Sequence, residues 1–289
     1  MTVRELVKQA EEKLLEAGIG EAANDARELM MFLKGWNLTE YLMQASGKDG
    51  GAELSAADLA RYREMTEKRA ARIPLQHLTG KAYFYGYEFT VNPSVLIPRY
   101  DTEILVQAVL SENRGNAEEK AVLDLCTGSG CIACVLSLEG RFGQVDASDI
   151  SEDALDTAKS NAETLGAGVR FFSGDLFSAI GEVPGARYDL IVCNPPYIAE
   201  TERESLDPEV RFHDPETALF GGEDGLLFYR RIITEAPAFL KPGGKLYFEI
   251  GSSEAGAVSE LMRDRGFSDI RVYPDLSGKD RAVRGVWNR

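Results

Sequence analysis

The sequence predicts an α/β protein with a separate helical domain at its N-terminus. Over residues 121–289, short apolar segments of strand character alternate with segments whose apolar residues recur at helical spacing. Such alternation is typical of a parallel sheet with helices on both faces. Residues 1–80 show only helical patterns, and 289 residues are enough for two domains.

The N-terminal segment, residues 1–80, is predicted to form a small helical bundle. Apolar residues recur at helical spacing in Val3–Leu15 and again up to Gly35, and Ser55 is a suitable N-cap for a third helix that Pro74 ends. No catalytic set of side chains occurs there. We interpret this domain either as a packing unit or as a substrate-docking domain.

Residues 81–98 are predicted to form a β-hairpin that links the domains. Tyr83–Val91 is aromatic and β-prone, and Asn92-Pro93 would supply the turn before Val95-Leu96-Ile97. Pro98–Glu103 then opens a helix.

Residues 99–289 are expected to form the larger domain. Its candidate strands are Ala121–Leu125, Gln144–Ser148, Val169–Ser173, Tyr188–Cys193, Lys245–Ile250 and Ile270–Tyr273. Its candidate helices are Ile132–Leu138, Asp153–Leu165, Leu226–Leu240 and Glu254–Arg265. The long segment Ala199–Gly225 carries neither pattern, and such a loop in a compact domain usually serves as a lid or binding loop.

The segment Asp189–Ile198 joins a buried strand to a rigid polar turn, Asn194-Pro195-Pro196-Tyr197. Two prolines fix φ and remove two N–H donors, and Asn194 is held in extended backbone because it precedes a proline. Ligands bind at the carboxyl ends of strands in open α/β sheets. We therefore expect the turn to grip a planar amide or amine, whereas an ordinary tight turn would account only for Asn194-Pro195.

A glycine-rich turn, Cys126-Thr127-Gly128-Ser129-Gly130, follows the strand at Ala121–Leu125. Glycines at such a turn let a ligand approach the backbone and the helix N-terminus. Asp149, 19 residues after Gly130, stands where an acid can accept both ribose hydroxyls. The same pattern also satisfies the dinucleotide fingerprint of NAD-binding proteins.

Two further acids favour S-adenosylmethionine over NAD. Asp124 ends the first strand, where a carboxylate can face the ammonium group of that cofactor. Asp175 ends the third strand, where it can accept from the adenine amine while Leu176 or Phe177 packs on the ring.

The distribution of charged residues helps to indicate which class of molecule is the acceptor. Net charge is −15, and residues 91–289 carry 20 basic and 33 acidic residues, against 12 and 14 in residues 1–90. Surfaces that hold nucleic acid are normally basic, so a protein or small-molecule acceptor is favoured over DNA or RNA. No apolar run predicts a membrane span or a signal peptide, so we expect a cytoplasmic protein with reduced cysteines.

Cys126, Cys131 and Cys134 have the spacing that begins a plant-type iron–sulfur pattern, with Cys193 as a candidate fourth ligand. We expect small buried thiols instead, because one falls in the glycine turn and two fall on a helix. The two histidines are too few for a histidine-based metal site, and no metal is expected.

These motifs resemble those of the release-factor glutamine methyltransferase family, bacterial enzymes that methylate the glutamine of the Gly-Gly-Gln motif in class 1 peptide release factors. The likeness covers nearly the whole chain. Its motifs are Pro74-Leu75-Gln76-x-Leu78-x-Gly80, Phe84-Tyr85-Gly86, Val95-Leu96-Ile97-Pro98-Arg99, Asp124–Gly130, Asn194–Tyr197, Gly221-Gly222-x-Asp224-Gly225-Leu226 and Asp275–Arg281. Two departures occur: Tyr100–Glu103 stands where the family commonly has Pro-Glu-Thr-Glu, and Cys126 stands where many methyltransferases have glycine.

The resemblance implies a Rossmann-like class I methyltransferase with a doubly wound, mostly parallel seven-stranded sheet. It implies S-adenosylmethionine as methyl donor, S-adenosylhomocysteine as product, and class 1 release factors as protein substrate. The expected cofactor residues are Asp124, Cys126, Thr127, Gly128, Ser129, Gly130, Asp149, Asp175, Leu176 and Asn194. The expected catalytic residues are Asn194, Pro195 and Tyr197, with Pro196 completing the substrate-binding turn.

Three other functions stay open at this point. A sister enzyme that methylates a glutamine of a ribosomal protein would share the chemistry. DNA and RNA exocyclic-amine methyltransferases share the Asn194–Tyr197 motif. An NAD-dependent oxidoreductase, or a non-catalytic nucleotide-binding module, fits the glycine turn.

Overall fold

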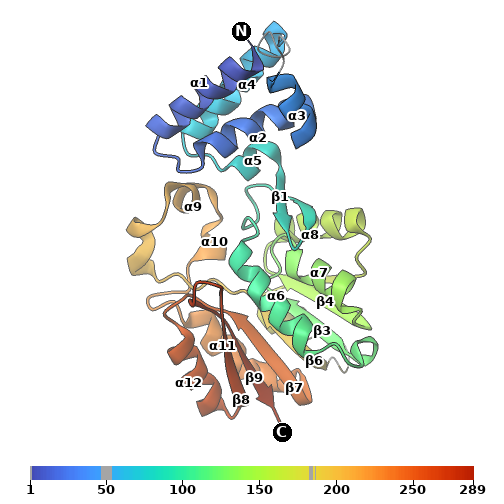
Figure 1. Ribbon diagram of the computed structural model, residues 1–289. Coiled ribbons are helices and arrows are strands. Elements are labelled where there is room, and N and C mark those ends of the chain that lie inside the picture. Colours follow the sequence, from blue (N-terminus) through green and yellow to red (C-terminus); the bar gives the residue numbers. More distant parts are fainter. Residues whose placement is uncertain (1, 47–53, 182–184, 186) are drawn as a thin grey trace. The chain divides into compact units, whose positions relative to one another are not determined.

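The computed structural model describes residues 2–46, 54–181, 185 and 187–289. These residues form two compact units (Figure 1). The helical unit comprises the described residues up to Gly80 together with Asp207–His213, and the sheet unit comprises Lys81–Leu206 and Asp214–Arg289. Residues 81–98 thus pack with the sheet unit, and a short segment from the predicted loop packs with the helical unit.

The helical unit is built from short amphipathic helices around one apolar core. Its helices are α1 (Val3–Glu16), α2 (Ala22–Lys34), α3 (Leu38–Ala45), α4 (Ala56–Ala70), α5 (Leu75–Thr79) and α9 (Pro208–His213). The predicted N-cap at Ser55 is confirmed, because its hydroxyl accepts from the Asp58 N–H at 3.1 Å. Arg69, buried in α4, pairs with Asp25 at 2.8 Å and with Glu209 of α9 at 3.0 Å, which holds α9 to the unit.

The hairpin turns at a different place from the one predicted. Its strands are β1 (Lys81–Phe84) and β2 (Tyr87–Thr90), joined at Tyr85-Gly86 rather than at Asn92-Pro93. Tyr85 and Gly86 both have positive φ, 52° and 83°, which gives the turn the twist that a two-residue hairpin requires. Val95 and Ile97, predicted as strand, are buried in loop conformation beside Ala82.

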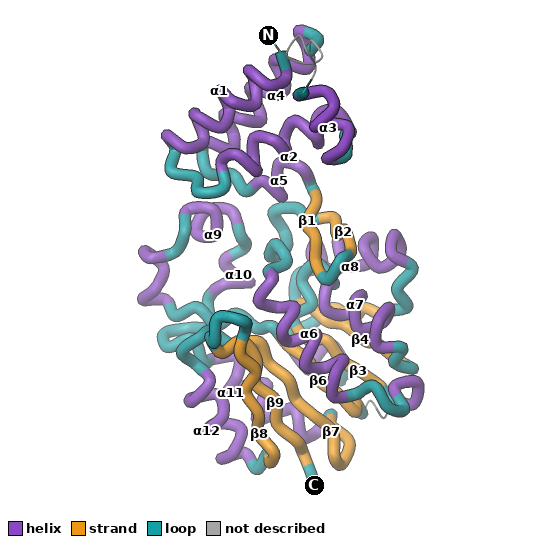
Figure 2. Tube along the Cα trace, viewed as in Figure 1, coloured by secondary structure: helices purple, strands orange, loops and turns teal. Residues whose placement is uncertain are grey.

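A seven-stranded sheet forms the centre of the sheet unit (Figure 2), and it confirms the predicted fold class. Its order is β5-β4-β3-β6-β7-β9-β8. The strands are β3 (Ala121–Leu125), β4 (Gln144–Asp149), β5 (Arg170–Ser173), β6 (Tyr188–Cys193), β7 (Leu240–Glu249), β8 (Ser268–Pro274) and β9 (Asp280–Trp287). The strands from β5 to β7 are parallel, whereas β9 runs antiparallel to both β7 and β8. The residue pattern alone had not indicated β9.

Helices cover both faces of the sheet because its strands alternate their apolar side chains between two cores. Val122 and Leu190 face a core shared with α6 (Tyr100–Glu112) and α7 (Cys131–Gly140). Leu123 and Ile191 face a core shared with α11 (Leu227–Glu235) and α12 (Ala255–Arg265). The strand order changes direction at β3, because β4 and β5 lie on one side of it and β6 and β7 on the other. The carboxyl ends of β3 and β6 therefore flank a topological switch point, where ligands bind in such sheets.

Two predicted segments differ in detail. Ala199–Gly225 contains three short helical turns, η3 (Glu200–Ser205), α9 and α10 (Glu216–Leu219). The helix predicted over Leu226–Leu240 ends at Glu235, and the following 3₁₀ turn, η4 (Ala236–Ala238), contains Pro237, which cannot continue the α-helical hydrogen bonding. The remaining helix, α8 (Glu152–Leu165), and the 3₁₀ turns η1 (Ala117–Glu119) and η2 (Leu176–Ala179) complete the described structure. Among the described helices, none has the length and apolar character that crossing a membrane requires.

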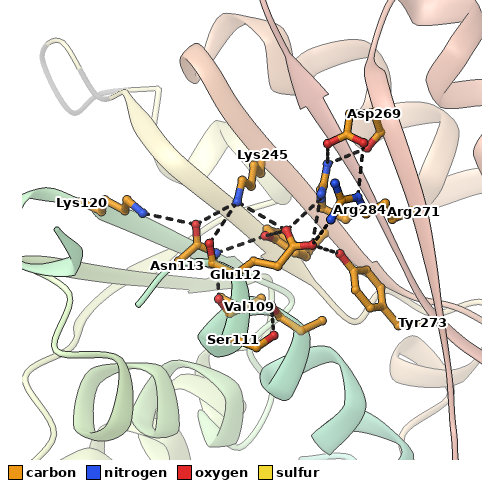
Figure 3. A network of polar contacts seen from close by, with 12 residues as sticks. Val109, Ser111, Glu112, Asn113, Lys120, Lys245, Asp269, Arg271, Tyr273 and Arg284 are labelled. Carbon is orange, nitrogen blue, oxygen red and sulfur yellow. Dashed lines mark hydrogen bonds and ion pairs between the residues drawn. The ribbon is translucent and has the colours of Figure 1, made fainter. Parts of the chain in front are cut away.

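A polar network centred on Glu112 fixes the end of α6 to the antiparallel edge of the sheet (Figure 3). The Glu112 carboxylate pairs with Arg284 of β9 at 3.1 Å and accepts from Tyr247 at 3.0 Å and Tyr273 at 2.5 Å. Burial alone would raise the pKa of Glu112, but the hydrogen bonds from Tyr273 and Arg284 outweigh it and hold this pKa at about 2. The folded state therefore stabilises Glu112 in its ionised form.

Candidate active site

A cavity of about 310 Å³ lies in the sheet unit at the carboxyl ends of β3, β4 and β6. Of the predicted site residues, those on its lining are Cys126, Thr127, Gly128, Ser129, Asp149, Asp175, Leu176, Asn194 and Pro196. Asp124, Gly130, Pro195 and Tyr197 are not on the lining. The structure thus brings both predicted motifs, the glycine turn and the Asn194–Tyr197 turn, to one cavity.

The glycine turn adopts left-handed backbone at three positions, Cys126 (φ 58°), Gly128 (φ 54°) and Gly130 (φ 79°). Glycine adopts this left-handed conformation without strain. Cys126 adopts it at a cost of about 1–2 kcal/mol, because its Cβ comes too close to the backbone. Gly130 is required for a second reason, because a Cβ there would lie 2.9 Å from Cβ of Ala158. The turn can therefore bring its backbone close to a ligand.

Asp149, at the end of β4, fixes the glycine turn with its own carboxylate. Its Oδ2 accepts from the Gly128 N–H at 2.9 Å, and its Oδ1 accepts from the Ser151 N–H at 3.0 Å. Each carboxylate oxygen has capacity for a further donor. Asp149 can hold the turn and still accept from a diol in the cavity.

Asp124 is buried beneath the turn rather than displayed on the cavity lining. The Thr127 hydroxyl donates to its Oδ2 at 2.6 Å, and burial raises the pKa of Asp124 to about 7. Asp124 is not on the cavity lining, whereas Thr127 is, and a direct contact between Asp124 and an ammonium group stays a prediction. In this structure Asp124 supports the turn from below.

At the end of β5, an ion pair occupies one edge of the cavity. Asp175 Oδ2 accepts from the Arg231 guanidinium of α11 at 2.7 Å, and both residues are on the lining. Of the two apolar side chains suggested for the adenine ring, only Leu176 lines the cavity. Phe177 is buried and stacks on Phe239 with ring centroids 4.6 Å apart, so Leu176 is the better placed of the two alternatives.

The Asn194–Tyr197 turn leaves β6 at the cavity and is held from two sides. The Asn194 amide donates to the Thr102 hydroxyl of α6, and the Tyr197 hydroxyl donates to Glu249 of β7, both at 3.4 Å. Burial raises the pKa of the Tyr197 hydroxyl well above its ordinary value, so it stays protonated. Asn194 reaches the cavity itself.

The Gly221–Leu226 motif supports the backbone of that turn. A Cβ on Gly221 would lie 2.7 Å from the Pro196 carbonyl oxygen, and one on Gly225 would lie 2.3 Å from the Tyr197 carbonyl oxygen. The Gly221 N–H donates to the Ile198 carbonyl at 2.9 Å. These glycines therefore let the loop pack directly against the turn.

Sequence reasoning missed several residues of this site. Ile150, directly after Asp149, is 64% exposed and lines the cavity, as do Phe228 and Arg231 of the α11 region. The position after a strand-end acid could have indicated Ile150. Arg99, which pairs with Asp214 at 2.6 Å, had been noted only as part of a family motif.

The cysteines do not gather around one point in the described chain. Cys131 and Cys134 are buried on α7, where burial raises the pKa of the Cys134 thiol to about 12. Cys126 lines the cavity and Cys193 is buried at the end of β6. No cluster of potential metal ligands occurs within the described residues.

A glycine turn after the first sheet strand, an acid ending the next strand and a cavity at the switch point are the features of a Rossmann-like, nucleoside-binding α/β domain. The fold is shared with a methyltransferase from Pyrococcus furiosus, which superposes with a TM-score of 0.56 at 20% identity, covering 77% of this chain and all of that one. Residues 100–210 match the model of the methyltransferase small domain, and residues 5–80 match the PrmC N-terminal domain.

Full-length relatives narrow the class to one family. The release factor glutamine methyltransferase of Deinococcus radiodurans is 39% identical over 284 residues, which is 98% of each chain. The enzyme of that name in Bacillus subtilis is 40% identical over 287 residues, covering 98% of this chain and 96% of its own. The chain belongs to the release factor glutamine methyltransferase family.

Proposed function

We propose that the protein transfers a methyl group from S-adenosylmethionine to the side-chain amide nitrogen of the glutamine in the Gly-Gly-Gln motif of class 1 peptide release factors. The observation that carries this proposal is the Asn194–Tyr197 turn opening onto the cavity that the glycine turn also lines. Family membership supplies the substrate class. Release factors act on ribosomes, so we place the reaction in the cytoplasm.

The residues around the cavity fit S-adenosylmethionine by their chemistry. Asp149 offers carboxylate oxygens for the ribose hydroxyls, and the left-handed turn at Cys126–Gly130 exposes backbone to the methionine part. Leu176, Ile150 and Phe228 give apolar surface for the adenine ring. Asp175 is the acceptor for the adenine amine, provided that it shares its carboxylate with Arg231.

When bound, S-adenosylmethionine supplies a methyl group made electrophilic by its sulfonium. An amide nitrogen is a weak nucleophile, so the main task of the chain is to hold it in line. Asn194 Oδ1 and the Pro195 carbonyl are the acceptors for the two amide hydrogens, and the Tyr197 ring packs on the amide plane. The same oxygens stabilise the positive charge that develops on nitrogen, and the surplus proton passes to water.

The decisive experiment is incubation with a purified release factor and S-adenosylmethionine labelled in the methyl group, followed by mass spectrometry of the digested substrate. We expect one methyl on the glutamine of Gly-Gly-Gln, and none on a release factor in which that glutamine is replaced by glutamate. Ribosomal proteins and RNA in parallel reactions distinguish the alternatives. Methylation of one of these, with an unmodified release factor, would refute the proposal.

A further inference from the structure

Glu249, the last residue of β7, is an acid buried directly behind the Asn194–Tyr197 turn. It is 2% exposed. In the parallel pairing of β6 and β7, Cys193 is opposite Phe248, so Glu249 and Asn194 leave neighbouring strands at the same level. Burying an ionisable group is costly unless it is hydrogen-bonded, so its contacts indicate what it does.

Those contacts run to both functional side chains of the turn. The Tyr197 hydroxyl donates to Glu249 Oε1, whereas Oε2 has no hydrogen-bond partner in the described part of the chain. Thr102, buried on α6, lies near enough to this carboxyl for its hydroxyl to stabilise the charged form and so to lower the pKa of Glu249. Thr102 in turn accepts from the Asn194 amide.

The direction of this chain of contacts determines how the Asn194 amide is turned. A carboxylate only accepts hydrogen bonds, so a hydroxyl beside it must point its single proton toward it. Thr102 then has only its oxygen lone pairs to offer to Asn194, which must present Nδ2 to Thr102. Oδ1 is left for the cavity, which is the orientation needed to accept an amide hydrogen from a substrate.

We propose that Glu249 is a positioning residue that, through Thr102 and Tyr197, orients the Asn194–Tyr197 turn for the glutamine amide. This inference rests on the proposed function of that turn. The contacts through Asn194 and Tyr197 are long, 3.4 Å, as catalytic hydrogen bonds often are before the substrate binds.

The charged and titratable groups that face the Glu249 carboxyl belong to α6, to β9 and to the turn itself. Asp101 of α6 pairs with Arg281 of β9 at 2.8 Å, and Tyr229 of α11 donates to the Glu249 backbone carbonyl and to Glu254. Burial, supported by the nearby Asp101 charge, raises the pKa of Glu249 to about 7. The orienting carboxylate form is therefore lost as the pH falls below about 7.

The test compares Glu249→Leu with the wild-type enzyme, using a glutamine-containing release factor as substrate. We expect kcat to fall about 10- to 100-fold, as when an outer-shell partner of a reacting group is removed, with the dissociation constant for S-adenosylmethionine changed less than about threefold. The rate of the wild type should fall below about pH 7, and that of the variant should fall less over this range, because only the contribution of Asp124, whose pKa is also about 7, is left. Glu260→Leu, which replaces an exposed acid on α12, is the control and should keep its kcat.

Thr102 variants carry the test independently of whether Glu249→Leu folds. Thr102→Val should lose kcat to a similar extent, Thr102→Ser should retain it, and Glu249→Leu with Thr102→Val should be no slower than either change alone, because the two act in one chain. Wild-type kcat in Glu249→Leu or in Thr102→Val would overturn the inference. Failure of the wild type itself to methylate the release factor would instead refute the proposed function.

Discussion

The Glu112 network gives a stability prediction that can be worked from its contacts. The carboxylate is 15% exposed and holds Arg284, which is 2% exposed. Its pKa is lowered from 4.5 to about 2, and each pH unit between the folded and unfolded pKa is worth about 1.4 kcal/mol, so the carboxylate contributes about 3 kcal/mol. Glu112→Gln keeps the volume but leaves the guanidinium without this partner, and we expect a loss of about 2–3 kcal/mol at pH 7.

The measurement is urea unfolding followed by Trp287 fluorescence in a Trp36→Phe background, because Trp287 belongs to the sheet unit and Trp36 to the helical unit. A lowered folded-state pKa gives stability that is present above about pH 4.5 and disappears as the pH falls through about 2. The gap between variant and wild type should therefore narrow over that range. Glu260→Gln, an exposed acid on α12, is the control and should change stability by less than about 0.5 kcal/mol.

An equal unfolding midpoint for Glu112→Gln and wild type at pH 7 would refute this reasoning. So would a gap that stays constant down to pH 2. Either result would mean that the network contributes through packing and not through the ionised carboxylate.

Three further predictions concern the cavity. Asn194→Ala should reduce turnover about 10²- to 10³-fold, as expected for removal of a transition-state hydrogen-bonding group, with S-adenosylmethionine affinity nearly unchanged by calorimetry; near-normal methylation would contradict its role. Asp149→Ala should weaken S-adenosylmethionine binding at least tenfold, because it removes both the ribose acceptor and the bond that holds Gly128, and unchanged affinity would exclude that assignment. Gly130→Ala should lower the melting temperature more than Gly128→Ala, because only the former brings a Cβ to 2.9 Å from Ala158 while both have positive φ; equal losses would leave backbone strain as the only cost.

Local residue patterns were sufficient for the elements that depend on neighbours in the chain. β3 begins and ends where the apolar run predicts, and the N-cap of α4 is at Ser55. In the hairpin, such patterns allow two positions for the turn. Both Tyr85-Gly86 and Asn92-Pro93 contain turn-forming residues, and the choice of the first followed from the register Phe84↔Tyr87, which is a property of the paired strands.

The hydrogen-bonding partners of the site residues could not be predicted from local sequence patterns. Asp175 is paired with a residue 56 positions away, Tyr197 with one 52 away, and Asn194 with one 92 away. Nothing in the local sequence of Glu249 distinguishes it from an ordinary strand-end acid. Likewise, the alternation of apolar residues did not predict that the Thr127 hydroxyl would donate to Asp124.

The sequence by itself determined that two turns end neighbouring strands, because glycine and proline act on the backbone at their own positions and need no distant partner. Cys126–Gly130 was predicted as a glycine-rich turn after a strand, and Asn194–Tyr197 as a rigid end to one. Only the tertiary structure decided which side chains face the cavity and which support it from behind. Those orientations are set by hydrogen bonds and packing between strands and helices that are adjacent in the sheet but distant in the chain.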